Sequence, residues 1–171
     1  MQPALSGAYR ILVDLGSGLG YYSDKLREHA KCLIGLDIFS SSLRIARETK
    51  VFDDLICADI MHLPLRLERI DCLTLFDVIE HLSENDGKAL LEFLEPSVFV
   101  STPNSNLSNT WYARLIGNPL ERHVSTWSKS DLEDLGYKAS VRSPPWWMLL
   151  LGNKGILLAY RPKCKHQQRH H

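Results

Sequence analysis

The feature that most constrains this chain is a mostly apolar segment that ends in three closely spaced glycines. The segment is Arg10–Leu15, and the glycines are Gly16, Gly18 and Gly20. The apolar run predicts a buried strand, and the glycines predict a turn whose backbone can approach a ligand before a helix begins. The free N–H groups at a helix start are typical of ligand sites. We therefore expect a binding loop at the carboxyl end of the first strand.

The spacing of the glycines separates this loop from two common phosphate-binding loops. A dinucleotide fingerprint has the pattern G-x-G-x-x-G, but here the position of its third glycine is Tyr21. The Walker pattern is also absent, because no G-K-S or G-K-T follows the glycines. Asp14 precedes the loop, and a carboxylate there would repel a pyrophosphate and suit a ligand with an ammonium group.

Short apolar runs alternate with helix-like stretches along most of the chain. The expected strands are Arg10–Leu15, Cys32–Leu36, Leu55–Ala58, Ile70–Phe76 and Val98–Ser101, followed by Lys138–Arg142 and Gly155–Tyr160. The expected helices are Tyr21–Ala30, Ser40–Glu48 with serine caps, Asp86–Leu94, and Ser128–Leu135 capped by Ser128 or Ser130. Unbroken apolar strands that alternate with helices predict an α/β fold with a doubly wound, mostly parallel sheet.

Three further carboxylates stand where expected strands end. Asp37 closes the second strand 17 residues after Gly20, Asp59 closes the third, and Asp77 follows the fourth. In a doubly wound sheet the carboxyl ends of the parallel strands open on one crevice. A carboxylate at Asp37 can accept hydrogen bonds from both hydroxyls of a ribose. Asp59, taken alone, is equally consistent with a turn or a helix cap.

These motifs, in this order, resemble the class I S-adenosylmethionine-dependent methyltransferases. The resemblance rests on Val13–Gly20, Gly35–Asp37, Cys57–Ile60 and Phe76–Leu82. It implies a Rossmann-like, seven-stranded sheet in the order 3-2-1-4-5-7-6 with strand 7 antiparallel, and S-adenosylmethionine as the cofactor. The cofactor-binding residues that it implies are Asp14, Gly16, Ser17, Gly18, Gly20, Asp37, Ile38, Asp59, Ile60, Phe76 and Asp77.

Methyl transfer mainly requires that two atoms be held in line, so no nucleophilic triad is expected. An oxygen acceptor would also need a base or a metal ion to take its proton. The candidate catalytic residues are Glu80, His81 and His123, near the expected position of the methyl group. Three interpretations stay open: Glu80 and His81 only begin a helix, His81 is a metal-free base, or the three residues hold a divalent ion together with Asp77.

The metal-site interpretation is supported by a second family resemblance. The arrangement, followed by Thr102, Pro103 and Asn104, is similar to that of the small-RNA 3′-terminal 2′-O-methyltransferases, except that Asp77 stands where that family has a glutamate. The ubiquinone-pathway O-methyltransferases share a similar Glu-His pair. We assign no metal to the chain on this ground.

Two aromatic regions are candidates for the acceptor site. We expect a single domain over residues 1–162, with a substrate-lid insertion at 104–127 and a basic tail at 163–171. The candidate substrate residues are Asn104, Trp111, Tyr112, Trp146 and Trp147. The apolar Trp146–Leu151 run is as consistent with core packing as with a homodimer or partner interface.

The formal net charge of zero hides an asymmetry. Residues 135–171 carry seven basic and no acidic residues, whereas residues 1–134 carry 13 basic and 20 acidic residues. We expect methyl transfer to an oxygen or nitrogen of a small, partly apolar acceptor. The alternatives are an RNA or protein methyltransferase that uses the basic C-terminal region, or a non-catalytic cofactor-binding partner subunit.

The cysteines and the N-terminus bear on location. No C-x-x-C pair is present, and Cys32, Cys57 and Cys72 stand in apolar runs, as buried free thiols do. Residues 1–10 lack the features of a signal peptide, and no apolar run is long enough to span a bilayer. We therefore expect a cytoplasmic protein.

Overall fold

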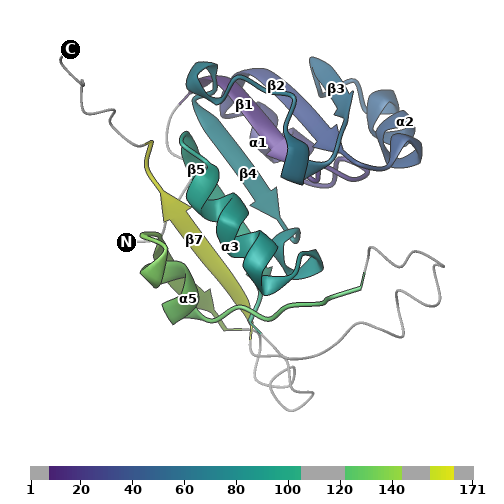
Figure 1. The fold of residues 1–171 in the computed structure, drawn as a ribbon. Coiled ribbons are helices and arrows are strands. Elements are labelled where there is room, and N and C mark those ends of the chain that lie inside the picture. Colours follow the sequence, from purple (N-terminus) through teal and green to yellow (C-terminus); the bar gives the residue numbers. More distant parts are fainter. Residues whose placement is uncertain (1–7, 105–121, 144–154, 164–171) are drawn as a thin grey trace.

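A seven-stranded sheet runs through the molecule in the order β3-β2-β1-β4-β5-β7-β6 (Figure 1). The computed structural model describes residues 8–104, 122–143 and 155–163. The strands are β1 Tyr9–Leu15, β2 Ala30–Asp37, β3 Asp54–Cys57, β4 Cys72–Phe76, β5 Ser97–Pro103, β6 Lys138–Arg142 and β7 Ile156–Arg161. The first five strands pair in parallel, and β7 is antiparallel to both β5 and β6. The predicted fold and strand order are confirmed.

The connections between strands are short helices. The α-helices are α1 Ser23–Arg27, α2 Ser40–Glu48, α3 Glu84–Phe93 and α5 Lys129–Asp134, and the 3-10 helices are η1 Ile60–His62, η2 Leu67–Arg69 and η3 Ile79–His81. Because β1, β2 and β3 step in one direction, right-handed crossovers place α1 and α2 on the same face of the sheet. Figure 1 shows α3 in front of the sheet and α5 beside it near β7.

The core lies on both faces of the sheet. Adjacent residues of β1 divide between the two faces, as strand geometry requires: Leu12 packs with Leu26 of α1, whereas Val13 and Leu15 pack in the cluster that contains Leu91 of α3. The central strands are therefore covered on both sides. Burial on both faces makes the ends of these strands rigid, and the candidate site lies at these ends.

Several element ends differ from the prediction. The helix expected at Tyr21–Ala30 is reduced to the five residues of α1, because Ala30 already pairs with Tyr9 in the sheet. Helix α2 has Phe39 at its N-cap and no side-chain cap, so the expected serine cap is wrong. Cys57 is exposed, because it lies on the edge strand β3, whereas Cys72 is buried as expected.

Some expectations concern residues outside the described ranges. These are most of the 104–127 insertion, with Trp111 and Tyr112, the Trp146–Leu151 run with Trp147, and all of the tail after Lys163. Among the described residues, no helix combines the length and the apolar character that crossing a bilayer requires.

Candidate functional site

The carboxyl ends of the first four strands open on a cleft of about 670 Å³, within the size range of small-molecule sites. The cleft is lined by residues of the glycine loop, the ends of β2 and β4, and the segments that follow β2, β3 and β4. All of the expected cofactor-binding residues line it except Asp14 and Gly20. Strand ends far apart in the sequence thus contribute to one cavity.

The glycine loop is held against the end of β2. The backbone N–H groups of Gly16 and Ser17 both donate to the carbonyl oxygen of Leu36, at 2.7 and 3.0 Å. Gly16 has a φ of +75°, and a Cβ there would lie 2.5 Å from Cγ2 of Val78. Only glycine fits this position, because both the conformation and the space exclude a side chain. Ser17 Oγ is buried and has no hydrogen-bond partner among the described residues.

The Asp37 carboxylate joins the loop to the end of β2. Its Oδ2 accepts a 2.8 Å hydrogen bond from the N–H of Gly18, and its Oδ1 accepts one of 2.8 Å from the N–H of Phe39. A carboxylate has about four acceptor positions, so both oxygens keep capacity for a ligand. The side chain is buried but lines the cleft. Asp37 is therefore oriented before any ligand arrives.

Asp14 lies beneath the loop and not in the cleft. Thr74 Oγ1 donates a 2.6 Å hydrogen bond to its Oδ1, and the side chain is 3% exposed. Burial raises the pKa of Asp14 to about 7, and the nearby charge of Asp37 adds to the rise, whereas the Thr74 hydrogen bond opposes it. The contact of Asp14 with a cofactor ammonium group stays a prediction, and the side chain does not line the cleft.

Asp77 and Tyr22 meet across the cleft. Tyr22 Oη donates to Asp77 Oδ2 at 2.9 Å, and its ring stands edge-on to Phe76 with centroids 5.1 Å apart. Asp77 has a φ of +56°, a left-handed conformation that costs energy for a residue other than glycine and clusters at functional sites. Sequence reasoning missed Tyr22, because it assigned that residue to a helix; its place directly after the glycine loop was the available signal.

Asp59 caps a short helix and also lines the cleft. Its Oδ1 accepts a 2.8 Å hydrogen bond from the N–H of Met61 and so caps η1. It also lines the cleft, next to Ile60. A cap at this position does not exclude contact with a ligand.

Glu80, His81 and His123 come together in the structure, which is the proximity that the metal-site interpretation requires. One ligand atom from each lies within 4.8 Å of the others, and the two imidazole centroids are 5.0 Å apart. His81 lines the cleft. Its Nδ1 lies 3.3 Å from the carbonyl oxygen of Arg122, which can only accept, so Nδ1 carries the proton and a neutral ring keeps its lone pair on Nε2.

Glu80 is the buried member of this cluster. It is 2% exposed, and its Oε2 accepts a 2.8 Å hydrogen bond from Thr102. Its Oε1 is buried without a hydrogen-bond partner within residues 8–104, 122–143 and 155–163. Burial raises the pKa of Glu80 to about 8, and burial followed by the charge of His81 lowers the pKa of His123. Two imidazoles beside an incompletely bonded carboxyl group are a donor set that divalent ions accept.

The expected substrate residues are not assembled by the described part of the chain. Asn104, at the end of β5, donates its backbone N–H to the carbonyl oxygen of Gly155 at 2.8 Å and does not line the cleft. Trp111, Tyr112, Trp146 and Trp147 lie outside the described ranges.

Comparison with known proteins was made on sequence and on structure. Residues 13–95 match a family model described as "Methyltransferase domain". A malonyl-[acyl-carrier protein] O-methyltransferase of Yersinia pestis is 34% identical over 83 residues, which are 48% of this chain and 31% of that protein. The chain thus spans about a third of the length of that relative.

Solved structures resemble the fold over most of the chain. A complex between the Haloferax volcanii Trm112 methyltransferase activator and a putative methyltransferase matches with a TM-score of 0.67 and 16% identity, over 93% of this chain and 84% of that one. The small RNA methyltransferase HEN1 matches with a TM-score of 0.64 and 22% identity, over 90% of this chain and 23% of that one. At these identities the likeness establishes the fold alone.

Proposed function

We propose that this chain, which matches a methyltransferase domain over residues 13–95, is a class I S-adenosylmethionine-dependent methyltransferase. It binds S-adenosylmethionine in the cleft and methylates a small, partly apolar acceptor at oxygen or nitrogen. The observation that carries the proposal is the Asp37 carboxylate, fixed beside the glycine loop with acceptor capacity left on both oxygens. The hydroxyl of Ser17 in the same loop has no hydrogen-bond partner among the described residues and so fits a polar ligand.

S-adenosylmethionine, held by the glycine loop and Asp37, would supply an electrophilic methyl group to the lone pair of the acceptor. The chain's own residues then have three tasks: to bind, to orient and to accept a proton. The loop and Asp37 hold the ligand, and orientation of this kind is worth roughly 7–11 kcal/mol of the barrier. Tyr22 and Phe76, whose rings are in contact, both line the cleft and limit the space in it.

The acceptor loses a proton when oxygen is methylated, and His81 is suited to take it. Its Nδ1–H is bonded to the Arg122 carbonyl oxygen, so Nε2 is the basic atom. His81 lines the cleft, whereas Glu80 lies behind it and His123 beside it. We assign the role of base to His81 and a supporting role to the other two residues.

A second candidate is methylation of RNA, favoured by the geometry of the Glu80, His81 and His123 cluster. The buried Oε1 of Glu80, which has no hydrogen-bond partner in the described part of the chain, and the two imidazoles within 4.8 Å fit a divalent ion. Such an ion would be held by these three side chains and would polarise an acceptor hydroxyl. Asp77 is already bonded to Tyr22, so it is not needed as a ligand.

Substitution of Asp37 tests the main proposal. We expect Asp37→Ala to weaken S-adenosylmethionine binding by about 10²-fold or more, since each lost hydrogen bond to a charged group costs about 1.5–3 kcal/mol. Isothermal titration calorimetry measures this directly. Asp24→Ala is the matched control, because Asp24 is exposed on α1 and does not line the cleft. Unchanged affinity in Asp37→Ala would reject the proposed cofactor site.

A further inference from the structure

The segment at residues 122–127 is bound along η3, the 3-10 helix that carries Glu80 and His81. The backbone N–H groups of Val124 and Ser125 donate to the carbonyl oxygen of Glu80 at 2.9 and 3.2 Å. Ser125 Oγ donates to the carbonyl oxygen of Ile79 at 3.2 Å. These bonds connect parts of the chain more than 40 residues apart, and they flank His123.

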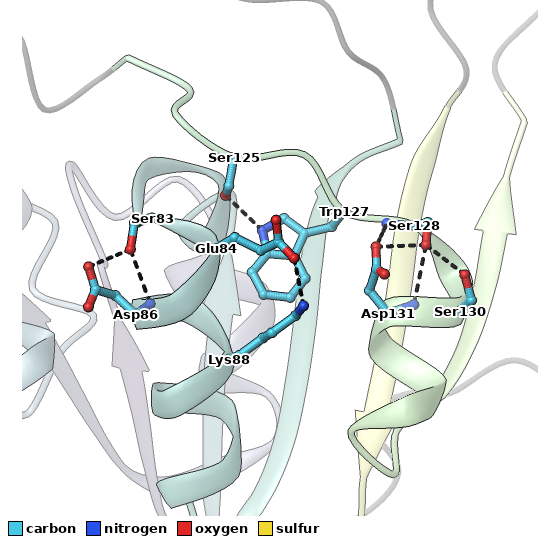
Figure 2. A network of polar contacts seen from close by, with 9 residues as sticks. All are labelled: Ser83, Glu84, Asp86, Lys88, Ser125, Trp127, Ser128, Ser130 and Asp131. Carbon is cyan, nitrogen blue, oxygen red and sulfur yellow. Dashed lines mark hydrogen bonds and ion pairs between the residues drawn. The ribbon is translucent and has the colours of Figure 1, made fainter.

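Trp127 ends this segment and is buried, with 3% of its surface exposed. Its Nε1–H is shared between the carbonyl oxygen of Ile79, at 3.3 Å, and Ser125 Oγ, at 3.0 Å. Figure 2 shows the indole between the start of α3 and the start of α5, with its N–H directed at Ser125. The same side chain therefore contacts η3 through its polar atom and α3 through its ring.

The ring occupies a space that exists only because α3 has a glycine at position 87. A Cβ on Gly87 would lie 2.5 Å from Cζ2 and 3.1 Å from Cη2 of Trp127. Helix propensity alone favours alanine over glycine in a helix interior, and the φ of Gly87 is not in the left-handed region. Position 87 is thus a glycine because the indole of Trp127 fills the space of a side chain, and not because the backbone of α3 requires a positive φ there.

We propose that Trp127, packed over Gly87 and bonded to Ile79, is a positioning residue that brings His123 against His81 and Glu80. The inference rests on the proposed function for its purpose, because His123 matters only if the cluster acts on the acceptor. The contacts by which Trp127 positions His123 do not depend on the proposed function. His123 lies four residues before Trp127, and the bonds of Val124 and Ser125 to Glu80 hold the intervening chain in one register.

A spectroscopic test uses the two histidines themselves. In protein labelled at histidine, nuclear Overhauser effects between the rings of His81 and His123 report their 5.0 Å separation. We expect Gly87→Ala to abolish these signals, because the new methyl group displaces the indole. We expect Gly87→Ala/Trp127→Phe to regain them in part, because phenylalanine lacks the atoms that collide but also lacks the N–H that is bonded to Ile79. Such rescue would show that the effects of the two substitutions are not additive, as is expected for residues in contact.

Controls separate positioning from a general loss of structure. Asn85→Ala, an exposed position on the same helix, is expected to keep the signals. Calorimetric binding of S-adenosylmethionine is expected to stay within about twofold of the wild type in every variant, a difference of about 0.4 kcal/mol, since Asp37 and the glycine loop are not touched. Labelled methyl transfer into a cell extract is expected to fall by about 10²-fold in Gly87→Ala, the effect of a displacement of about 1 Å.

Two results would overturn the inference: ring–ring signals that persist in Gly87→Ala, or a double variant that shows no rescue. Failure of the proposed function has a different signature. If His81→Ala and His123→Ala leave methyl transfer intact while Gly87→Ala still separates the rings, the positioning geometry stands and the catalytic role of the cluster does not.

Discussion

Asp14 and Asp37 carry the same carboxyl group near the ends of neighbouring strands, but their surroundings make them different. Asp14 lies under the glycine loop with one hydrogen bond from Thr74, and desolvation dominates, so its pKa is raised to about 7. Asp37 receives backbone N–H groups on both oxygens and opens on the cleft. Two acidic residues that look alike in the sequence thus have different roles, one beneath the loop and one in the proposed binding site.

The raised pKa of Asp14 predicts how stability depends on pH. Between about pH 4 and 7 the folded chain keeps the Asp14 proton and the unfolded chain releases it, so the free energy of unfolding falls as pH rises. One such group contributes a slope of at most about 1.4 kcal/mol per pH unit. We expect Asp14→Asn to remove this share of the slope, measured by urea unfolding at pH 5 and pH 7. The wild-type slope also includes Glu80, whose pKa is raised to about 8. Identical slopes in variant and wild type would contradict the assignment.

Elements near the site are short and depend on particular contacts. Helix α5 has six residues, too few to be stable alone, and it begins directly after Trp127. Ser128 Oγ accepts the N–H of Asp131 at 3.2 Å, and the Asp131 carboxylate accepts the N–H of Ser128 at 2.8 Å. Figure 2 shows this capping box beside the indole. The cap therefore fixes the far end of the segment that carries His123.

Loss of this cap should be measurable. We expect Ser128→Ala to lower the free energy of unfolding by about 1 kcal/mol, the usual cost of removing a serine N-cap, as measured by urea denaturation. Ser130→Ala is the matched control, because Ser130 contacts the Ser128 hydroxyl but no backbone N–H of the helix start. Equal losses in both variants would show that the cap is not the stabilising contact.

Two basic residues near the C-terminal end of the described chain lie on the opposite side of the sheet's strand ends from the cleft. Arg161 pairs with Val98 in the sheet, so it lies at the amino ends of the parallel strands, opposite the cleft. It stacks on the Tyr137 ring and donates to the carbonyl oxygen of Leu94. Lys163 donates to the carbonyl oxygen of Ile70 at 3.0 Å, at the same edge. These two of the seven basic residues in 135–171 therefore make structural contacts away from the cleft.

The proposed function predicts the class of the acceptor. With labelled S-adenosylmethionine and a fractionated cell extract, we expect label in small molecules, at a rate that changes little between 50 and 200 mM salt. An RNA acceptor held by 6–10 phosphate contacts would lose about 10³–10⁵-fold in affinity over that range. Label in RNA that disappears with ribonuclease, or with a chelator, would favour the second candidate function instead.

Much of the fold could be predicted from local patterns, because apolar runs and glycines report burial and turns directly. The strand order also followed, through the family resemblance. The ends of elements were less accurate: α1 is shorter than its helical spacing suggested, because pairing of Ala30 in the sheet takes precedence over helix propensity. Trp127 was included in a substrate lid, whereas it is buried against Gly87, a contact between residues 40 positions apart.

The sequence by itself determined the binding loop, the strand-end carboxylates and the alternation of strands and helices, since each depends on neighbouring residues. Only the tertiary structure decided which carboxylates reach the cleft, that Tyr22 meets Asp77, and that His123 returns to His81. These outcomes depend on burial and on contacts between distant segments, and no local pattern specifies them. The glycine at position 87 illustrates the difference, because its reason is the side chain that packs on it.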